Sequence, residues 1–128
     1  MTGAVAATFG ARGATPGGPL NAPSPLVWND IYGEDSGSTQ TLTVGGITTP
    51  IQLTASRTGG GLLSYIINGA YMPYAGAFTV SPNDTLAWAI STTGSADRSG
   101  VITVTNASAG AMLDRFDYLI YSSHGVRV

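Results

Sequence analysis

The chain of 128 residues contains no cysteine and no lysine, and it carries little charge of either sign. The lack of cysteine excludes disulfide bonds, thiolate metal sites and a cysteine nucleophile. Charged residues make up 9% of the chain, against about 25% in ordinary soluble domains. We therefore expect much of the surface to be buried in an assembly, because a lone monomer normally carries more charge. The alternative is a β-protein that stays soluble through its serine and threonine hydroxyls.

Basic clusters and long apolar stretches are missing as well. Five basic residues stand against seven acidic ones, and the arginines are scattered along the chain (Arg12, Arg57, Arg98, Arg115 and Arg127). No basic stripe is present to neutralise phosphates, so we expect no binding of nucleic acid. No run of about 18 apolar residues occurs, so we expect no membrane-spanning helix. Residues 1–20 also lack the basic start and unbroken apolar stretch of a secretory signal.

The first 25 residues are rich in glycine, alanine and proline, with prolines at positions 16, 19, 23 and 25. This composition opposes both helices and sheet ladders, and alone in water such a segment is expected to be disordered. The sequence therefore predicts an extended assembly arm over residues 1–25 that lies on a partner chain. Val5, Phe9 and Leu20 are its predicted apolar anchors. Packing of the arm on its own domain is the alternative.

Residues 26–122 predict a single all-β domain, because their apolar and polar residues alternate with a period of two. The alternation is clear in residues 39–44 and 51–56. Asn68 and Gly69 between two apolar runs are typical of a hairpin with a type I′ turn. The turns recur at roughly ten-residue spacing, which is typical of a sandwich. We expect an antiparallel β-sandwich of seven or eight strands, with a tail over residues 123–128.

The predicted core is centred on Trp88. Leu86 and Ile90 alternate with it on one strand and should point the same way. Residues 26–28 predict a further short apolar strand near the start of the domain. Residues 112–121 predict the last strand because they are rich in aromatic and apolar side chains, with a helix as the alternative.

Catalytic chemistry finds little support in the sequence. His124 is the single histidine, and a hydrolase would need it as a base beside Ser122 or Ser123, with Asp114 or Asp117 behind it. Residues so close together on a tail do not easily reach that geometry, and no Gly-x-Ser-x-Gly motif is present. We therefore predict that the protein is not an enzyme and that it has no cofactor.

Acidic residues form two groups that are candidates for binding calcium. Asp30, Glu34 and Asp35 make up the first, and Asp114 and Asp117 the second. Neither spacing matches an EF-hand, and a basic residue interrupts the second group. We expect solvated loop carboxylates and no metal site, with calcium at the first group as the alternative.

Several exposed side chains are candidates for a contact surface. Tyr71 and Tyr74 follow the predicted hairpin turn, so at least one ring should face solvent, where it can bind a sugar or a protein. Asp97 and Arg98 lie near the tip of a polar loop over residues 91–99 and are further candidates. Trp28 and Tyr32 are aromatic residues that could extend the same platform.

Four motifs in order resemble an immunoglobulin-like repeat that is found in tailed-phage virion proteins and bacterial surface proteins. They are the strand opening over residues 43–51, the hairpin over 65–71, the turn over 80–86 and the closing strand over 100–106. Together with Trp28 and the residues after it, the resemblance covers residues 28–120. The chain departs from the pattern at Asn83, where the family has glycine before Asp84; asparagine also tolerates the left-handed conformation.

The resemblance implies an immunoglobulin-like sandwich used for display, attachment or particle decoration, and it brings no catalytic residues. We predict a non-enzymatic structural protein at the virion surface of a tailed phage. Its most favoured role is capsid decoration, with the arm clasping neighbouring shell subunits. The expected partners are the major capsid protein, other virion proteins and copies of itself in a homo-oligomer. The alternative is a receptor- or glycan-binding module on a phage tail or fibre or on a bacterial surface, with a host surface glycan as ligand.

Overall fold

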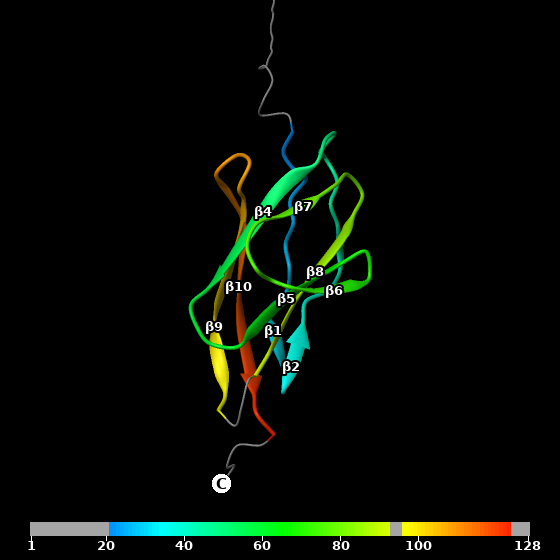
Figure 1. Ribbon diagram of the computed structural model, residues 1–128. Coiled ribbons are helices and arrows are strands. Elements are labelled where there is room, and N and C mark those ends of the chain that lie inside the picture. The colour runs from blue at the N-terminus through cyan, green and yellow to red at the C-terminus, as the bar shows by residue number, and fades with distance from the viewer. Residues whose placement is uncertain (1–20, 93–95, 124–128) are drawn as a thin grey trace, which may run out of the picture.

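The computed structural model describes residues 21–92 and 96–123, and these residues form an all-β sandwich (Figure 1). Ten strands lie in two facing sheets. The predicted arm anchors Val5, Phe9 and Leu20 lie outside the described residues, as does His124. The described residues include no helix long and apolar enough to span a bilayer.

The first sheet has five strands that follow one another in space in the order β1, β10, β9, β4 and β7. Its strands are β1 (Ile31–Glu34), β10 (Ala111–Tyr121), β9 (Arg98–Asn106), β4 (Ile51–Arg57) and β7 (Phe78–Val80). β1 runs parallel to β10, and the other pairs are antiparallel. The strand prediction for residues 112–121 is confirmed, and the helix alternative is wrong.

The second sheet is built around β8, which pairs with three neighbours. Its strands are β2 (Ser36–Ser38), β3 (Leu42–Thr43), β8 (Thr85–Ser91), β5 (Leu62–Ile67) and β6 (Ala70–Pro73). Asp35 joins β1 of the first sheet to β2 of the second, and its φ of 64° gives the chain a sharp turn between the sheets. The two sheets together form the predicted immunoglobulin-like sandwich, with more short strands than the seven or eight expected.

Aromatic rings fill the core between the sheets. Trp88 is fully buried, with 0% of its surface exposed, and Leu86 and Ile90 are buried beside it as predicted. The Trp88 ring lies 5.7 Å from the Phe78 ring and 6.0 Å from the Trp28 ring, both at steep angles. Such edge-to-face packing places the positive edge of one ring against the negative face of the next.

The turn chemistry follows the sequence closely. Asn68 and Gly69 have φ of 50° and 85°, which confirms the type I′ turn between β5 and β6. Asn83 takes φ of 71°, the left-handed conformation that glycine would otherwise supply. Asp84 holds this second turn, because its carboxylate accepts a hydrogen bond from the backbone N–H of Ser81 at 2.8 Å and another from the Asn68 amide at 3.0 Å.

The strand predicted over residues 39–44 is interrupted. Thr39 lies between β2 and β3, and its hydroxyl accepts the Trp88 N–H at 3.0 Å while donating to the Gln40 carbonyl at 2.9 Å. A side chain that bonds to the backbone in this way replaces part of the regular ladder. Within residues 36–44, only 36–38 and 42–43 therefore pair as strands with β8.

Candidate functional surfaces

Residues 21–30, called here the docked segment, lie along the sandwich without joining a sheet ladder (Figure 1). Leu26 and Trp28 of this segment are 4% and 3% exposed, so both side chains belong to the core. The strand predicted over residues 26–28 is wrong, because these residues pair with no other strand. The prediction that their apolar side chains are buried holds for Leu26 and Trp28. Segments without a ladder must satisfy their backbone groups by other means.

Side chains from across the domain hold the docked segment. The backbone N–H of Trp28 donates to the Asp114 carboxylate at 2.7 Å, and its indole N–H donates to the Leu86 carbonyl at 3.2 Å. Asn29 and Gln40 exchange two hydrogen bonds between backbone N–H groups and side-chain oxygens, at 2.7 and 3.1 Å. The segment is thus tied to strands of both sheets.

The first described residue is fixed at one pole of the sandwich. The side-chain oxygen of Asn21 accepts the N–H groups of Thr48 and Thr49 at 2.9 and 3.2 Å, and its amide donates to the Thr49 hydroxyl at 2.8 Å. Ser24 adds a backbone bond to the Gly45 carbonyl at 2.8 Å. Residues 21–25, which were predicted to be part of the arm, are therefore in contact with the domain.

The last described residue lies at the opposite pole (Figure 1). Ser123 donates two hydrogen bonds to the Asp35 carboxylate, from its hydroxyl at 2.6 Å and from its backbone N–H at 2.9 Å. The backbone of Asp35 also bonds to Tyr121 and Thr92 at 2.8 and 2.9 Å. The chain consequently enters the sandwich at one pole and reaches Ser123 at the other.

Three of the acidic candidates for calcium, Asp30, Asp35 and Asp114, accept hydrogen bonds from backbone N–H groups. The Asp30 carboxylate accepts the N–H of Asp117 at 3.0 Å, while Asp35 binds Ser123. Within residues 21–92 and 96–123, no group of three or more histidine, cysteine or acidic side chains is arranged to hold a metal ion.

Two of the residues considered for hydrolysis, Ser122 and Asp114, make contacts within the fold. Ser122 is fully buried, and its backbone N–H donates to Asp97 at 2.9 Å. Asp114 is engaged with Trp28 of the docked segment. The structure therefore gives Asp97 and Asp114 structural contacts, and His124 lies outside the described residues.

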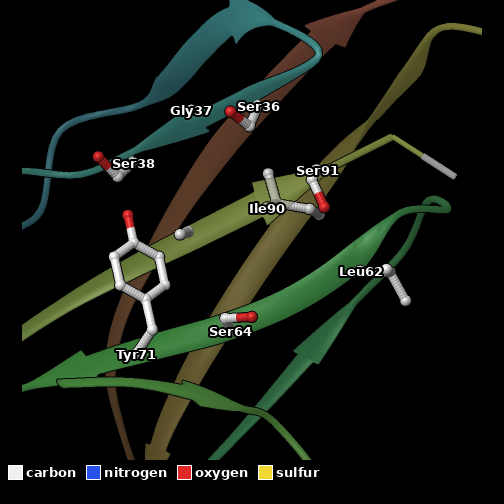
Figure 2. Close-up of a pocket in the computed structure, with 9 residues that line it drawn as sticks. Ser36, Gly37, Ser38, Leu62, Ser64, Tyr71, Ile90 and Ser91 are labelled. Atoms are coloured by element: carbon white, nitrogen blue, oxygen red, sulfur yellow. The ribbon is translucent and has the colours of Figure 1, made fainter.

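The outer face of the second sheet carries a shallow depression of about 270 Å³, which we call the serine face (Figure 2). It is lined by Ser36, Gly37, Ser38, Leu62, Ser64, Tyr71, Ala89, Ile90 and Ser91. Strand register explains how these residues meet, because Ser36 pairs with Ser91 and Ser91 pairs with Leu62. Two residues further along each strand, Ser38 pairs with Ala89, and Ala89 pairs with Ser64. Small side chains in adjacent rows leave the face hollow.

Tyr71 is the large side chain of the serine face. It is 67% exposed, and Figure 2 shows its ring extending across the face toward Ser38. Tyr74, three residues later, points into the core, where its ring packs on Phe78 and its hydroxyl accepts the Ala55 N–H at 2.9 Å. The two tyrosines predicted as one contact surface therefore lie on different faces of the second sheet. Only Tyr71 is placed to touch a partner there.

Asp97 and Arg98 lie away from Tyr71, at the pole of Ser123. Arg98 begins β9 in the first sheet and pairs with Ile120 of β10. The Tyr118 hydroxyl at this pole donates to the Gly60 carbonyl at 3.0 Å. Burial raises the pKa of the Tyr118 phenol above its usual value, while a backbone hydrogen bond and the Arg57 and Arg98 guanidinium groups lower it in part. The protonated phenol is thus the form that the fold favours.

A second exposed surface lies on the first sheet, over β1 and β10. Tyr32 is 69% exposed and its ring lies 5.5 Å from that of Tyr121. A shallow hollow beside it is lined by Asp30, Ile31, Tyr32, Asp117, Tyr118 and Leu119. Two carboxylates border this surface, whereas no charged residue lines the serine face.

The fold places the described chain among immunoglobulin-like β-sandwiches. Searches with family models and among curated proteins find no match. Among solved structures, the N-terminal domain of PorA is similar at a TM-score of 0.39 and 12% identity, covering 76% of this chain and 87% of that chain. A FixG-related protein from Vibrio parahaemolyticus is similar at a TM-score of 0.39 and 13% identity, covering 69% and 79% respectively. Neither structural similarity bears on the function of this chain.

Proposed function

We propose that this chain is a non-enzymatic structural protein of a tailed-phage virion that decorates the capsid surface. A place in the virion is supported by the four motifs between residues 28 and 120, whose order resembles the immunoglobulin-like repeat of tailed-phage virion proteins. The mode of attachment comes from the docked segment, which fixes the entry of the chain at the pole of Thr48 and Thr49. This fixed position of Asn21 is the observation that carries the proposal, because residues 1–20 join the described domain at that pole.

Attachment through residues 1–20 suits a decoration protein for a mechanical reason. Twenty residues can span at most about 70 Å, which is enough to pass from one shell subunit to the next. A pull on them is transmitted to Leu26 and Trp28, which are buried in the core. The sandwich would then be held to the shell at this pole, with its far pole directed away from the shell.

The proposed partners are the major capsid protein, other virion proteins and further copies of this chain. The low charge of 9% agrees with a surface that is partly covered in an assembly. Copies gathered around a symmetry axis of the shell would each insert the same arm into an equivalent site.

Cosedimentation with shells that lack this protein tests the proposal. The full chain should sediment with the shells, and a chain that begins at Asn21 should not. Cutting at this position keeps the hydrogen bonds of Asn21 and Ser24, so both chains should unfold at the same temperature. Equal sedimentation of the two chains would rule out attachment through residues 1–20.

Two further measurements make the test specific. Replacing Val5, Phe9 and Leu20 together by serine should weaken shell binding, while the same number of alanine-to-serine changes within residues 1–20 should leave it intact. Immunogold labelling of particles with antibody against residues 21–128 should mark heads. Labelling confined to tails or fibres would contradict capsid decoration.

A further inference from the structure

We infer that the serine face is a binding site for a neutral carbohydrate. The site does not depend on where the protein is attached, so it stands apart from the proposed decoration role. The inference starts from the lining of the face, in which none of the nine residues is charged. A charged ligand would lose its hydration there without gaining an opposite charge, so the face favours a neutral one.

The polar groups of the face match the hydroxyls of a sugar. Ser36, Ser38, Ser64 and Ser91 each bring a hydroxyl that can both donate and accept a hydrogen bond. They come from three neighbouring strands, which lie about 4.8 Å apart, and successive residues on one face of a strand are about 6.7 Å apart. The hydroxyls are therefore spread over an area on the scale of a sugar ring or two.

The aromatic ring of the face supplies the apolar contact that a sugar also needs. A pyranose ring has a face of C–H groups, which pack on an aromatic ring, and a rim of hydroxyls. Tyr71 presents such a ring, because it is 67% exposed and extends over the face from β6 (Figure 2). Leu62 is exposed on the same face and gives a second apolar contact.

The size of the depression agrees with a small ligand. Its volume of about 270 Å³ lies just below the usual volume of ligand sites, which is about 300–1,000 Å³. A stable protein interface buries much more apolar surface than Tyr71 and Leu62 offer. Ala89 keeps the floor low, and a larger side chain at position 89 would fill it.

The edge strand beside the face argues against a peptide added as a new strand. Ala70 flanks the two-residue turn and pairs with Ile67, so Tyr71 and Pro73 have their backbone groups on the free edge of β6. Proline has no N–H to donate, which leaves Tyr71 as the only residue of this short edge strand with an outward N–H. A sugar needs no such ladder.

Two-dimensional NMR of the isotope-labelled full chain tests the inference. The probes are neutral tetrasaccharides of hexose and of N-acetylhexosamine, a sialylated oligosaccharide, and a synthetic peptide of residues 1–20. We expect at least one neutral tetrasaccharide to shift the amides of Ser38, Ser64 and Ser91 in a saturable way, with a dissociation constant of about 0.1–10 mM. The sialylated probe should bind about tenfold more weakly than its neutral parent.

Matched variants separate the site from the rest of the fold. Tyr71→Ala and Ala89→Leu should each weaken binding at least about tenfold. Tyr32→Ala removes a tyrosine of nearly equal exposure from the other sheet, 69% against 67%, and should leave binding unchanged. Tyr71→Phe should retain binding, because the ring face is kept. Each variant must first give the dispersed spectrum of a folded sandwich.

Several results would overturn the inference. One is the absence of shifts with every neutral saccharide at about 20 mM, about twice the largest expected dissociation constant. Another is a set of shifts that lies outside the serine face or that Tyr32→Ala abolishes as strongly as Tyr71→Ala. A third is saturable binding of the peptide of residues 1–20 at these amides without any saccharide effect, which would make the face a site for the chain's own arm.

Discussion

The two tryptophans of the core are held in different ways, although their rings meet at 6.0 Å and both are buried. Trp88 lies in the middle of β8, which pairs with β5 on one side and with β2 and β3 on the other. Trp28 lies on the docked segment and is held by single hydrogen bonds to Asp114 and Leu86. A ladder ties a residue to the whole sheet, whereas single contacts can open locally.

The comparison suggests that the domain has a stable body and one detachable part. The body consists of the paired strands, and the detachable part is the docked segment of residues 21–30. In the proposed function this segment connects the attached arm to the sandwich. Four substitutions test whether the two parts respond differently.

Trp88→Ala should have the largest effect. Removing a fully buried indole leaves a cavity between the sheets and should cost about 3–5 kcal/mol in the free energy of unfolding. Because β8 pairs with strands on both sides, protection from hydrogen exchange should fall throughout the domain. Urea unfolding combined with exchange measured by NMR would check this. A loss of protection confined to β8 would contradict the role of Trp88 as the centre of the body.

Trp28→Ala should cost less, about 2–3 kcal/mol, because the docked segment can leave its site and relieve the cavity. Exchange should speed up in residues 21–30 while the amides of β5 and β8 keep most of their protection. The same pair of measurements applies. If both tryptophan variants lost protection uniformly, the docked segment would be part of the body and the comparison would fail.

Asp114→Asn should cost about 1–3 kcal/mol, because it weakens a charge-assisted hydrogen bond to the Trp28 N–H. The matched control is Asp117→Asn on the same strand, where the exposed residue donates its backbone N–H to Asp30 and keeps that bond. Thermal unfolding of the two variants gives the difference. Equal stability of the two would show that the Asp114 carboxylate does not hold the docked segment.

Tyr118→Phe should have the smallest effect at neutral pH, about 1 kcal/mol for the lost hydrogen bond to the Gly60 carbonyl. Burial raises the pKa of this phenol above the usual 10.0. The stability that this shift contributes is therefore fully present below pH 10.0 and is lost as the pH rises through the folded-state pKa.

Urea midpoints measured between neutral and alkaline pH would check the pH dependence. Above pH 10.0 the native protein should lose stability more steeply than the Tyr118→Phe variant. At neutral pH, Tyr32→Phe on the exposed surface should leave the midpoint unchanged. Parallel alkaline curves for the native protein and the Tyr118→Phe variant would contradict the predicted shift.

Local patterns predicted most of the strands, because they act over a few residues. Asn68 and Gly69 predicted the hairpin through their tolerance of positive φ, and both residues have it. The alternation around Trp88 predicted which side chains fill the core. The interruption at Thr39 was missed, because it depends on a hydroxyl that bonds to Trp88, 49 residues away.

The docked segment shows a second limit of local patterns. Residues 26–28 look like a strand, since Leu26 and Trp28 alternate with exposed Val27. Alternation reports burial on one side, however, and does not report whether a ladder partner is present. Asp114, which holds the segment, lies 86 residues from Trp28 and carries no local signal of that role.

The sequence by itself determined an all-β chain, its hairpin, its tryptophan-centred core and the low charge of its surface, because composition and period-two alternation are local properties. Only the tertiary structure decided that Tyr71 faces outward while Tyr74 turns inward, and that residues 21–30 fix the pole at which the chain enters. It also decided that serines from β2, β5 and β8 share one face. Strand order and register bring distant residues together, and no spacing along the chain encodes them.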